Sequence, residues 1–151
     1  METEEFEACL QASRAQRAGV SHPEGFELFD SLKASDADID RVERALGAKF
    51  PEKYKYFMKE HGGGGFVFLD VLPVVDPDGS SEDVLEVNGG ESATQDFIAV
   101  APVGTGDWWG FAVSEGVCLD QVEFLDHENG SRKAAASDFF EFLVREGLRA
   151  G

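Results

Sequence analysis

The residues with the clearest potential for metal chemistry are consecutive, at Asp126-His127-Glu128. Carboxylate and imidazole groups bind divalent metals, so a small metal-dependent hydrolase is one interpretation of this run. Adjacent residues on a strand point to opposite faces, however, and no His-Glu-x-x-His motif or second histidine cluster accompanies them. We therefore favour a surface loop at a strand end, and we expect no bound metal or cofactor.

Two glycine-containing segments can be compared with nucleotide-binding loops. The run 62–65 closes a predicted helix and leads into a strand, and it lacks the lysine of a phosphate loop. Gly104 and Gly106 begin a Gly-x-Gly pattern, but Trp109 occupies the position of the third glycine. Both segments are therefore interpreted as structural, a helix exit and a turn between strands.

Few other residues are candidates for a catalytic role. The only histidines are His22, His61 and His127. His61 falls on the apolar face of a predicted helix, near the C-terminus, where the helix dipole favours a histidine. No Gly-x-Ser-x-Gly motif is present, and Cys9 and Cys118 show no metal-binding spacing. We interpret the cysteines as reduced thiols, and we expect a binding protein rather than an enzyme.

Negative charge is the strongest feature of the composition. The net charge is -17 and the pI is about 4.3. No lysine or arginine occurs from His61 through Ser131, an interval that holds 14 acidic residues, whereas the remainder has 13 basic and 16 acidic residues. Such a field repels nucleic acids and anionic membranes and attracts basic proteins. The acids either serve solubility alone or form a surface for a basic partner.

The candidate contact residues lie in a predicted long loop at 76–96 and beside a tryptophan pair. Adjacent tryptophans on a strand face opposite ways, so one is expected to pack beneath the helices. The other is either an interface anchor or is covered by another part of the chain. The candidates for partner binding are Asp76, Asp78, Glu82, Asp83, Glu86, Glu91, Asp107, Trp108 and Trp109.

Helical elements are expected at both ends of the chain. Periodicity predicts helices at 3–18, 35–47, 50–61 and 137–149, with a connector at 19–34. Thr3 and Ser137 are the expected caps of the outer helices, Ser35 and Asp38 resemble a capping box, and Pro51 suits a first helical position. Gly47 is expected to end the second helix.

Strands are expected between the helices. Alternating apolar residues predict strands at 66–71, continuing to 75 past a bend, and at 97–101, 108–113 and 117–119, with 122–125 extending the last. Residues 84–87 read as a short strand or a helical turn. Short turns between sequential strands favour an antiparallel meander. The expected class is α+β, one domain over 1–151 with a mixed, mostly antiparallel sheet flanked by helices.

Targeting signals are not evident in the sequence. No stretch of about 18 apolar residues is present, as a membrane-spanning helix would need. Residues 1–5 are acidic and polar, unlike the basic start of a secretory signal. We therefore expect a cytoplasmic protein with no membrane partner.

The segment 39–64 resembles the signature of the SUKH superfamily. That signature has a helix ending in Leu-Gly, an apolar residue with proline, and a second helix with tyrosine that closes on Asn/His-Gly-Gly. The matching positions are Leu46, Gly47, Phe50, Pro51, Tyr54, Phe57, His61, Gly62 and Gly63. The later strands and the closing helix at 137–143 are also similar, so the resemblance extends over about residues 36–149. The glycine run is longer here than the usual pair.

The resemblance implies an α+β domain with a mixed sheet flanked by helices. Many bacterial members of the superfamily are immunity proteins that bind a cognate toxin in the cytoplasm, often a nuclease or a deaminase. Other members act as regulatory or scaffold domains, and the superfamily has no agreed catalytic residues. The leading hypothesis is an immunity protein for a basic toxin domain. The alternatives are a regulatory scaffold and the metal-dependent hydrolase, and the oligomeric state is left open.

Overall fold

The computed structural model describes residues 1–17, 30–75, 82–89 and 96–149. Its helices are α1 (Thr3–Arg17), α2 (Asp36–Leu46), α3 (Glu52–Glu60), α4 (Val84–Asn88) and α5 (Phe139–Phe142), which continues as the π-helix η1 (Leu143–Leu148). Its strands are β1 (Gly64–Phe66), β2 (Leu69–Val71), β3 (Phe97–Pro102), β4 (Trp108–Ser114), β5 (Val117–Leu125) and β6 (Arg132–Ala136). None of the helices in these ranges combines the length and apolarity that a membrane crossing requires.

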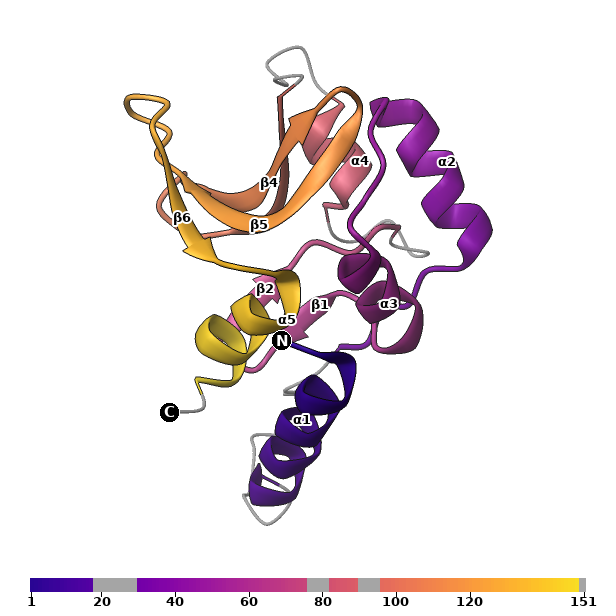
Figure 1. The fold of residues 1–151 in the computed structure, drawn as a ribbon, viewed down its shortest axis with the longest axis vertical. Coiled ribbons are helices and arrows are strands. Elements are labelled where there is room, and N and C mark those ends of the chain that lie inside the picture. The colour runs from indigo at the N-terminus through magenta and orange to yellow at the C-terminus, as the bar shows by residue number, and fades with distance from the viewer. Residues whose placement is uncertain (18–29, 76–81, 90–95, 150–151) are drawn as a thin grey trace.

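The strands form two antiparallel sheets, and the predicted α+β class is confirmed. The larger sheet is a meander with the order β3-β4-β5-β6, and the smaller is the β1–β2 hairpin. Glu115 and Gly116 both have positive φ, at +52° and +76°, and they join Ser114 to its partner Val117. This is the tight reversal expected there, because two-residue hairpin turns favour such angles. Figure 1 shows the larger sheet above the helices α3 and α5, with the small hairpin between them.

The start of α2 has the capping box that the sequence predicts. Ser35 Oγ accepts a hydrogen bond from Asp38 N, and Asp38 Oδ2 accepts one from Ser35 N, both at 3.1 Å. Gly47 ends the helix in a left-handed conformation, with φ +72°. The buried carboxylate of Glu43 then accepts a hydrogen bond of 2.7 Å from Phe50 N. The end of α2 is thereby joined to the start of α3, which follows Pro51.

The single strand predicted at 66–71 is wrong, because the chain folds back at Val67 to make the β1–β2 hairpin. Val67 has φ +57°, an unusual angle for a β-branched residue, and Phe66 pairs directly with Leu69. Both paired side chains are buried, while Phe68 at the turn is 55% exposed. The reversal is favoured because it buries Phe66 and Leu69 together. In one straight strand these two side chains would point to opposite faces, so the alternation pattern did not predict it.

Glycines 62–65 allow the segment from Asp30 to Ala34 to lie against them. Leu32 and Gly63 exchange two backbone hydrogen bonds, each of 3.0 Å, and Asp30 N donates to Gly65 O at the same distance. A Cβ on Gly62 would lie 2.4 Å from the carbonyl carbon of Leu32. The run is therefore a site of close backbone approach, which is more specific than the helix exit that the sequence suggested.

The C-terminal part differs from prediction in two places. A strand not predicted, β6, pairs with β5 at 132–136. The cap of α5 is Asp138 rather than Ser137, because the Asp138 carboxylate accepts the hydrogen bond from Glu141 N at 2.8 Å. Residues 84–87, expected as a strand or a helical turn, are helical and lie within α4.

Asp138 also connects the N-terminal residue with two helices. Its carboxylate is nearly buried and forms ion pairs with the amino group of Met1 and with Lys53 Nζ, the latter at 3.0 Å. Burial alone would raise the pKa of this carboxyl group, but hydrogen bonds from Glu141 N, the Met1 amino group and Lys53 outweigh that effect and lower it. The ion pairs therefore join the N-terminal residue and α3 to the cap of α5.

Aromatic side chains fill the core between the helices and the larger sheet. The rings of Phe6 and Phe140 stack at 4.5 Å and attach α1 to α5. Tyr54 on α3 contacts Phe111 of β4 and Phe139 of α5 edge-on. All five rings are at least 99% buried. This core holds α3 and α5 against one face of the sheet, as the sequence predicts.

Candidate functional site

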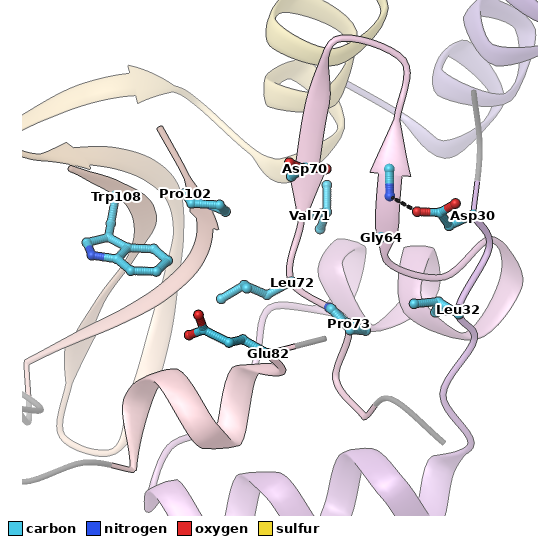
Figure 2. A pocket seen from close by; sticks show the side chains of 11 residues that line it. Asp30, Leu32, Gly64, Asp70, Val71, Leu72, Pro73, Glu82, Pro102 and Trp108 are labelled. Carbon is cyan, nitrogen blue, oxygen red and sulfur yellow. Dashed lines mark hydrogen bonds between the residues drawn. The ribbon is translucent and has the colours of Figure 1, made fainter. Parts of the chain in front are cut away.

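A cavity of about 310 Å³ lies between the β1–β2 hairpin and the β3–β4 part of the larger sheet. We call it the acidic pocket, and the six lining residues used below are Asp30, Asp70, Leu72, Glu82, Pro102 and Trp108. Figure 2 shows Trp108 and Glu82 on one side, Asp30 beside Gly64 on the other, and the β2 residues between them. Segments far apart in the sequence thus contribute to one concave surface.

The hairpin side of the acidic pocket depends on the glycine run. Asp30 Oδ2 accepts a hydrogen bond of 2.6 Å from Gly65 N. A Cβ on Gly64 would lie 2.6 Å from the Asp30 Cβ, so only glycine leaves room for this carboxylate. Asp70 lies on β2 between the buried residues Leu69 and Val71, and the alternation of the strand directs its side chain outward.

The sheet side of the acidic pocket is fixed by hydrogen bonds around α4. Leu72 N donates to Val100 O at 2.8 Å, which joins the chain after β2 to β3. The side-chain amide of Asn88 donates to Ala99 O and accepts from Ala99 N, both at 2.8 Å. Helix α4 is therefore held against β3, and Glu82 lies just before its cap, Asp83. Trp108 begins β4, opposite Pro102 on β3.

The described residues that line the pocket give it a negative charge. Asp30, Asp70 and Glu82 are all exposed, and the described residues that line the cavity include no lysine, arginine or histidine. The side chains of Asp70 and Glu82 form no ion pair or hydrogen bond with another residue in the described part of the chain. Like charges gathered around a concave surface produce a negative potential there, which attracts cations.

Of the nine candidate contact residues, the structure brings Glu82 and Trp108 together in the acidic pocket. Asp83 instead caps α4, accepting a hydrogen bond from Glu86 N at 2.8 Å, and Glu86 is exposed on that helix. The candidates Asp76, Asp78 and Glu91 lie outside the described residues.

Asp30 and Asp70 are not among the contact residues that the sequence predicts. The signal available for Asp70 is its place between two apolar residues of a strand, which predicts an exposed carboxylate. The signal for Asp30 is absent from the sequence, because its position depends on pairing with a glycine 35 residues away.

The two tryptophans face opposite sides of the larger sheet. The Trp109 ring packs against Phe142 of α5 at 5.3 Å and against Phe124 of β5 at 6.4 Å. Trp108 is partly exposed and lines the acidic pocket. Both side chains are partly buried, but Trp109 is the tryptophan that packs against α5, whereas Trp108 is the one that contributes to the acidic pocket.

A hydrogen-bonded network lies beside Trp108, where Asp107 contacts the turn after β5. Asp107 Oδ1 accepts hydrogen bonds from His127 N at 2.9 Å and from the His127 ring at 2.6 Å, and Thr105 Oγ1 donates to its second oxygen. The hydrogen bonds from His127 and Thr105 lower the pKa of Asp107 to about 2. In turn, the hydrogen bond to Asp107 raises the pKa of His127.

Potential metal ligands do converge here, although not as the sequence suggested. One ligand atom from each of Asp107, Asp126 and His127 lies within 4.8 Å of the others, and Glu128 is not among this group. The expectation that Asp126 and His127 diverge is wrong, because both follow the end of β5 and His127 lies in a turn. Hydrogen bonds already occupy the group, since Asp126 Oδ1 accepts from Glu128 N at 2.9 Å. These hydrogen bonds explain why the three side chains lie together: they support the turn after β5.

Other reactive side chains in the described part of the chain contribute to the fold. His61 Nε2 and the Tyr56 hydroxyl both hydrogen-bond to Glu7 Oε1 at 2.7 Å, which joins α3 to α1. Cys9 and Cys118 are free thiols, and burial raises the pKa of Cys118 to about 12. A thiol with so high a pKa is a poor nucleophile, so Cys118 is a structural residue.

A known protein family matches most of this chain. A family model, SUKH_6, described as SMI1-KNR4 cell-wall, matches residues 36–143. The match runs from the first residue of α2 to the first residue of η1, and it includes every acidic-pocket residue used here except Asp30. No curated protein matches the chain. The family model covers well over half of the sequence, and the chain therefore belongs to the SUKH family.

Proposed function

We propose that this protein is an immunity protein that binds a basic toxin domain through the surface around the acidic pocket. The observation that carries the proposal is the concave group of Asp30, Asp70 and Glu82 beside Trp108, with no basic side chain among the described lining residues. Membership of the SUKH family supports it, because immunity proteins are common in that superfamily. The protein acts by binding in the cytoplasm, and it performs no reaction of its own.

The charge of the surface suits a toxin that acts on nucleic acid. Proteins that bind nucleic acid use clustered lysine and arginine side chains to contact phosphates. An acidic protein surface can bind the same lysine and arginine side chains and so compete with the nucleic acid. It also accelerates the encounter between the two proteins, because opposite fields steer their diffusion. Neutralisation then results from blocking the substrate channel of the toxin.

The test is to co-express the protein with the product of the gene adjacent to its own. We expect that product to stop growth when expressed alone, to be harmless with this protein present, and to co-purify with it as a defined complex. An adjacent product that is neither toxic nor bound contradicts the proposal. Weak binding to several unrelated proteins, lost at moderate salt, instead indicates the regulatory scaffold.

A further inference from the structure

We infer that the basic partner also docks on the face of the larger sheet that points away from α5, where Val117 and Leu119 supply the apolar contact. We call this surface the open face. The identity of the partner rests on the proposed function, and the open face adds an apolar region to the interface around the acidic pocket.

The side chains of β4 show which way the open face points. Trp109 packs against Phe142 of α5, and Phe111 lies in the main core, so both point toward the helices. Because successive residues of a strand alternate, Trp108 and Gly110 point to the opposite side of the sheet. Figure 1 shows α3 and α5 below the larger sheet, so the open face is its upper side.

Two aliphatic side chains of β5 are exposed on the open face. Cys118 is buried in the main core, whereas its neighbours Val117 and Leu119 are 51% and 49% exposed. The alternation of the strand therefore directs both aliphatic side chains away from the helices and places them side by side. Adjacent exposed apolar side chains with polar residues around them are typical of surfaces that bind another protein.

The middle of the open face is ordered by contacts of its own. Phe97 is buried, although it lies outside the main core. A Cβ on Gly110 would lie 2.7 Å from Phe97 Cζ, so the ring rests on the glycine. The guanidinium group of Arg132 lies over the same ring, 5.8 Å from its centroid, and forms ion pairs with Asp96 and Glu123 at 3.6 and 3.5 Å. A partner therefore meets a preformed surface, and binding needs little reorganisation.

Acidic side chains border the open face at both ends. Asp107 precedes β4 and Asp126 follows β5 at one end, and Glu115 lies in the β4–β5 turn at the other. In the described part of the chain, Glu115 and Asp126 form no ion pair, and Arg132 is already paired with two acids. A basic protein is complementary to this border. A second copy of the chain, with its net charge of -17, would be repelled.

Trp108 connects the open face to the acidic pocket, because it lies on this face and also lines that cavity. At the other end of β4, Ser114 pairs with Val117. A rise of about 3.3 Å per residue places the two ends of the strand roughly 20 Å apart. A standard interface covers roughly 800 Å² on each partner, which is wide enough to span this distance. One partner can therefore contact the pocket, Trp108 and the aliphatic pair together.

The test is calorimetry with the product of the adjacent gene and the double variant Val117→Ala/Leu119→Ala. Each buried methylene group that is lost weakens binding about fourfold, so the double variant should bind at least about tenfold more weakly. The matched control is Phe68→Ala, which removes an equally exposed apolar side chain beside η1 and should leave the affinity unchanged. Thermal unfolding of both variants reports whether the fold is kept.

Three results overturn the inference: equal affinity of the double variant and the unaltered protein, an equal loss in Phe68→Ala, or no binding by any form. Sedimentation of the protein alone provides a further check. A dimer that the double variant abolishes would assign the open face to a second copy, which also overturns the inference.

The outcome is separable from that of the proposed function. If the adjacent gene product is not toxic but binds the double variant more weakly than the unaltered protein, the proposed function fails alone. If a toxic product binds the double variant with unchanged affinity, and Asp70→Asn/Glu82→Gln weakens its binding, the inference about the open face fails alone.

Discussion

Substitution of Gly62 by alanine tests whether the glycine run serves close backbone approach. Gly62 has φ +89°, and a Cβ there would lie 2.4 Å from Leu32 C and 2.6 Å from Lys33 N. A left-handed conformation costs a non-glycine residue about 1 to 2 kcal/mol. The collision with backbone atoms, which cannot rotate away, adds about 1 to 3 kcal/mol. The Gly62→Ala protein should therefore lose about 2 to 5 kcal/mol of unfolding free energy.

A matched control separates the two effects. Gly104 has φ +99°, and a Cβ there would meet no atom within 4 Å. Gly104→Ala should therefore lose only the conformational part, about 1 to 2 kcal/mol. Urea unfolding followed by circular dichroism gives both free energies from the midpoints, provided that the slopes agree. Equal losses in the two variants would refute the reasoning, because the contact with Leu32 would then have no energetic effect.

Two further predictions concern ionised groups. Asp138→Asn should cost about 2 to 4 kcal/mol at neutral pH, because Lys53 loses its nearly buried partner. Because the pKa of Asp138 is lowered, its contribution to the free energy of unfolding is present above pH 3.8 and is lost as the pH falls further. The stability difference between the variant and the unaltered protein, measured by urea titration, should therefore shrink at about pH 3. For His127, NMR should give a pKa above 6.5, which Asp107→Asn should move back toward 6.5. The stabilisation from His127 should therefore be complete below 6.5 and be lost as the pH rises through the raised pKa.

Local signals in the sequence predicted the helical block well. The capping box of Ser35 and Asp38 and the left-handed Gly47 follow from residue type alone, and both are confirmed. Strand β6 was missed because its sequence, Arg-Lys-Ala-Ala-Ala, contains no residue that favours strands. Pairing with β5 and the ion pair of Arg132 with Glu123 replace local propensity there. Contacts across the sheet therefore override the local preference.

The candidate site was predictable only in part. The absence of basic residues from the middle of the chain and the opposite facing of Trp108 and Trp109 are visible in the sequence. The convergence of Glu82 with Trp108 requires α4 to be held on β3 by Asn88, a contact that no motif indicates. Such long-range hydrogen bonds depend on the completed fold, so spacing along the chain cannot reveal them.

The most direct test of the account is the affinity of the adjacent gene product for three forms of this protein, measured by calorimetry. The unaltered protein and a control variant, Asp120→Asn, which removes an exposed charge on β5 outside the residues that line the pocket, should bind with equal affinity. The double variant Asp70→Asn/Glu82→Gln should bind at least about tenfold more weakly, because the two free carboxylates of the acidic pocket lose their charge. Equal affinity of all three forms, or no binding by any of them, would contradict the claim that the acidic pocket binds a basic partner.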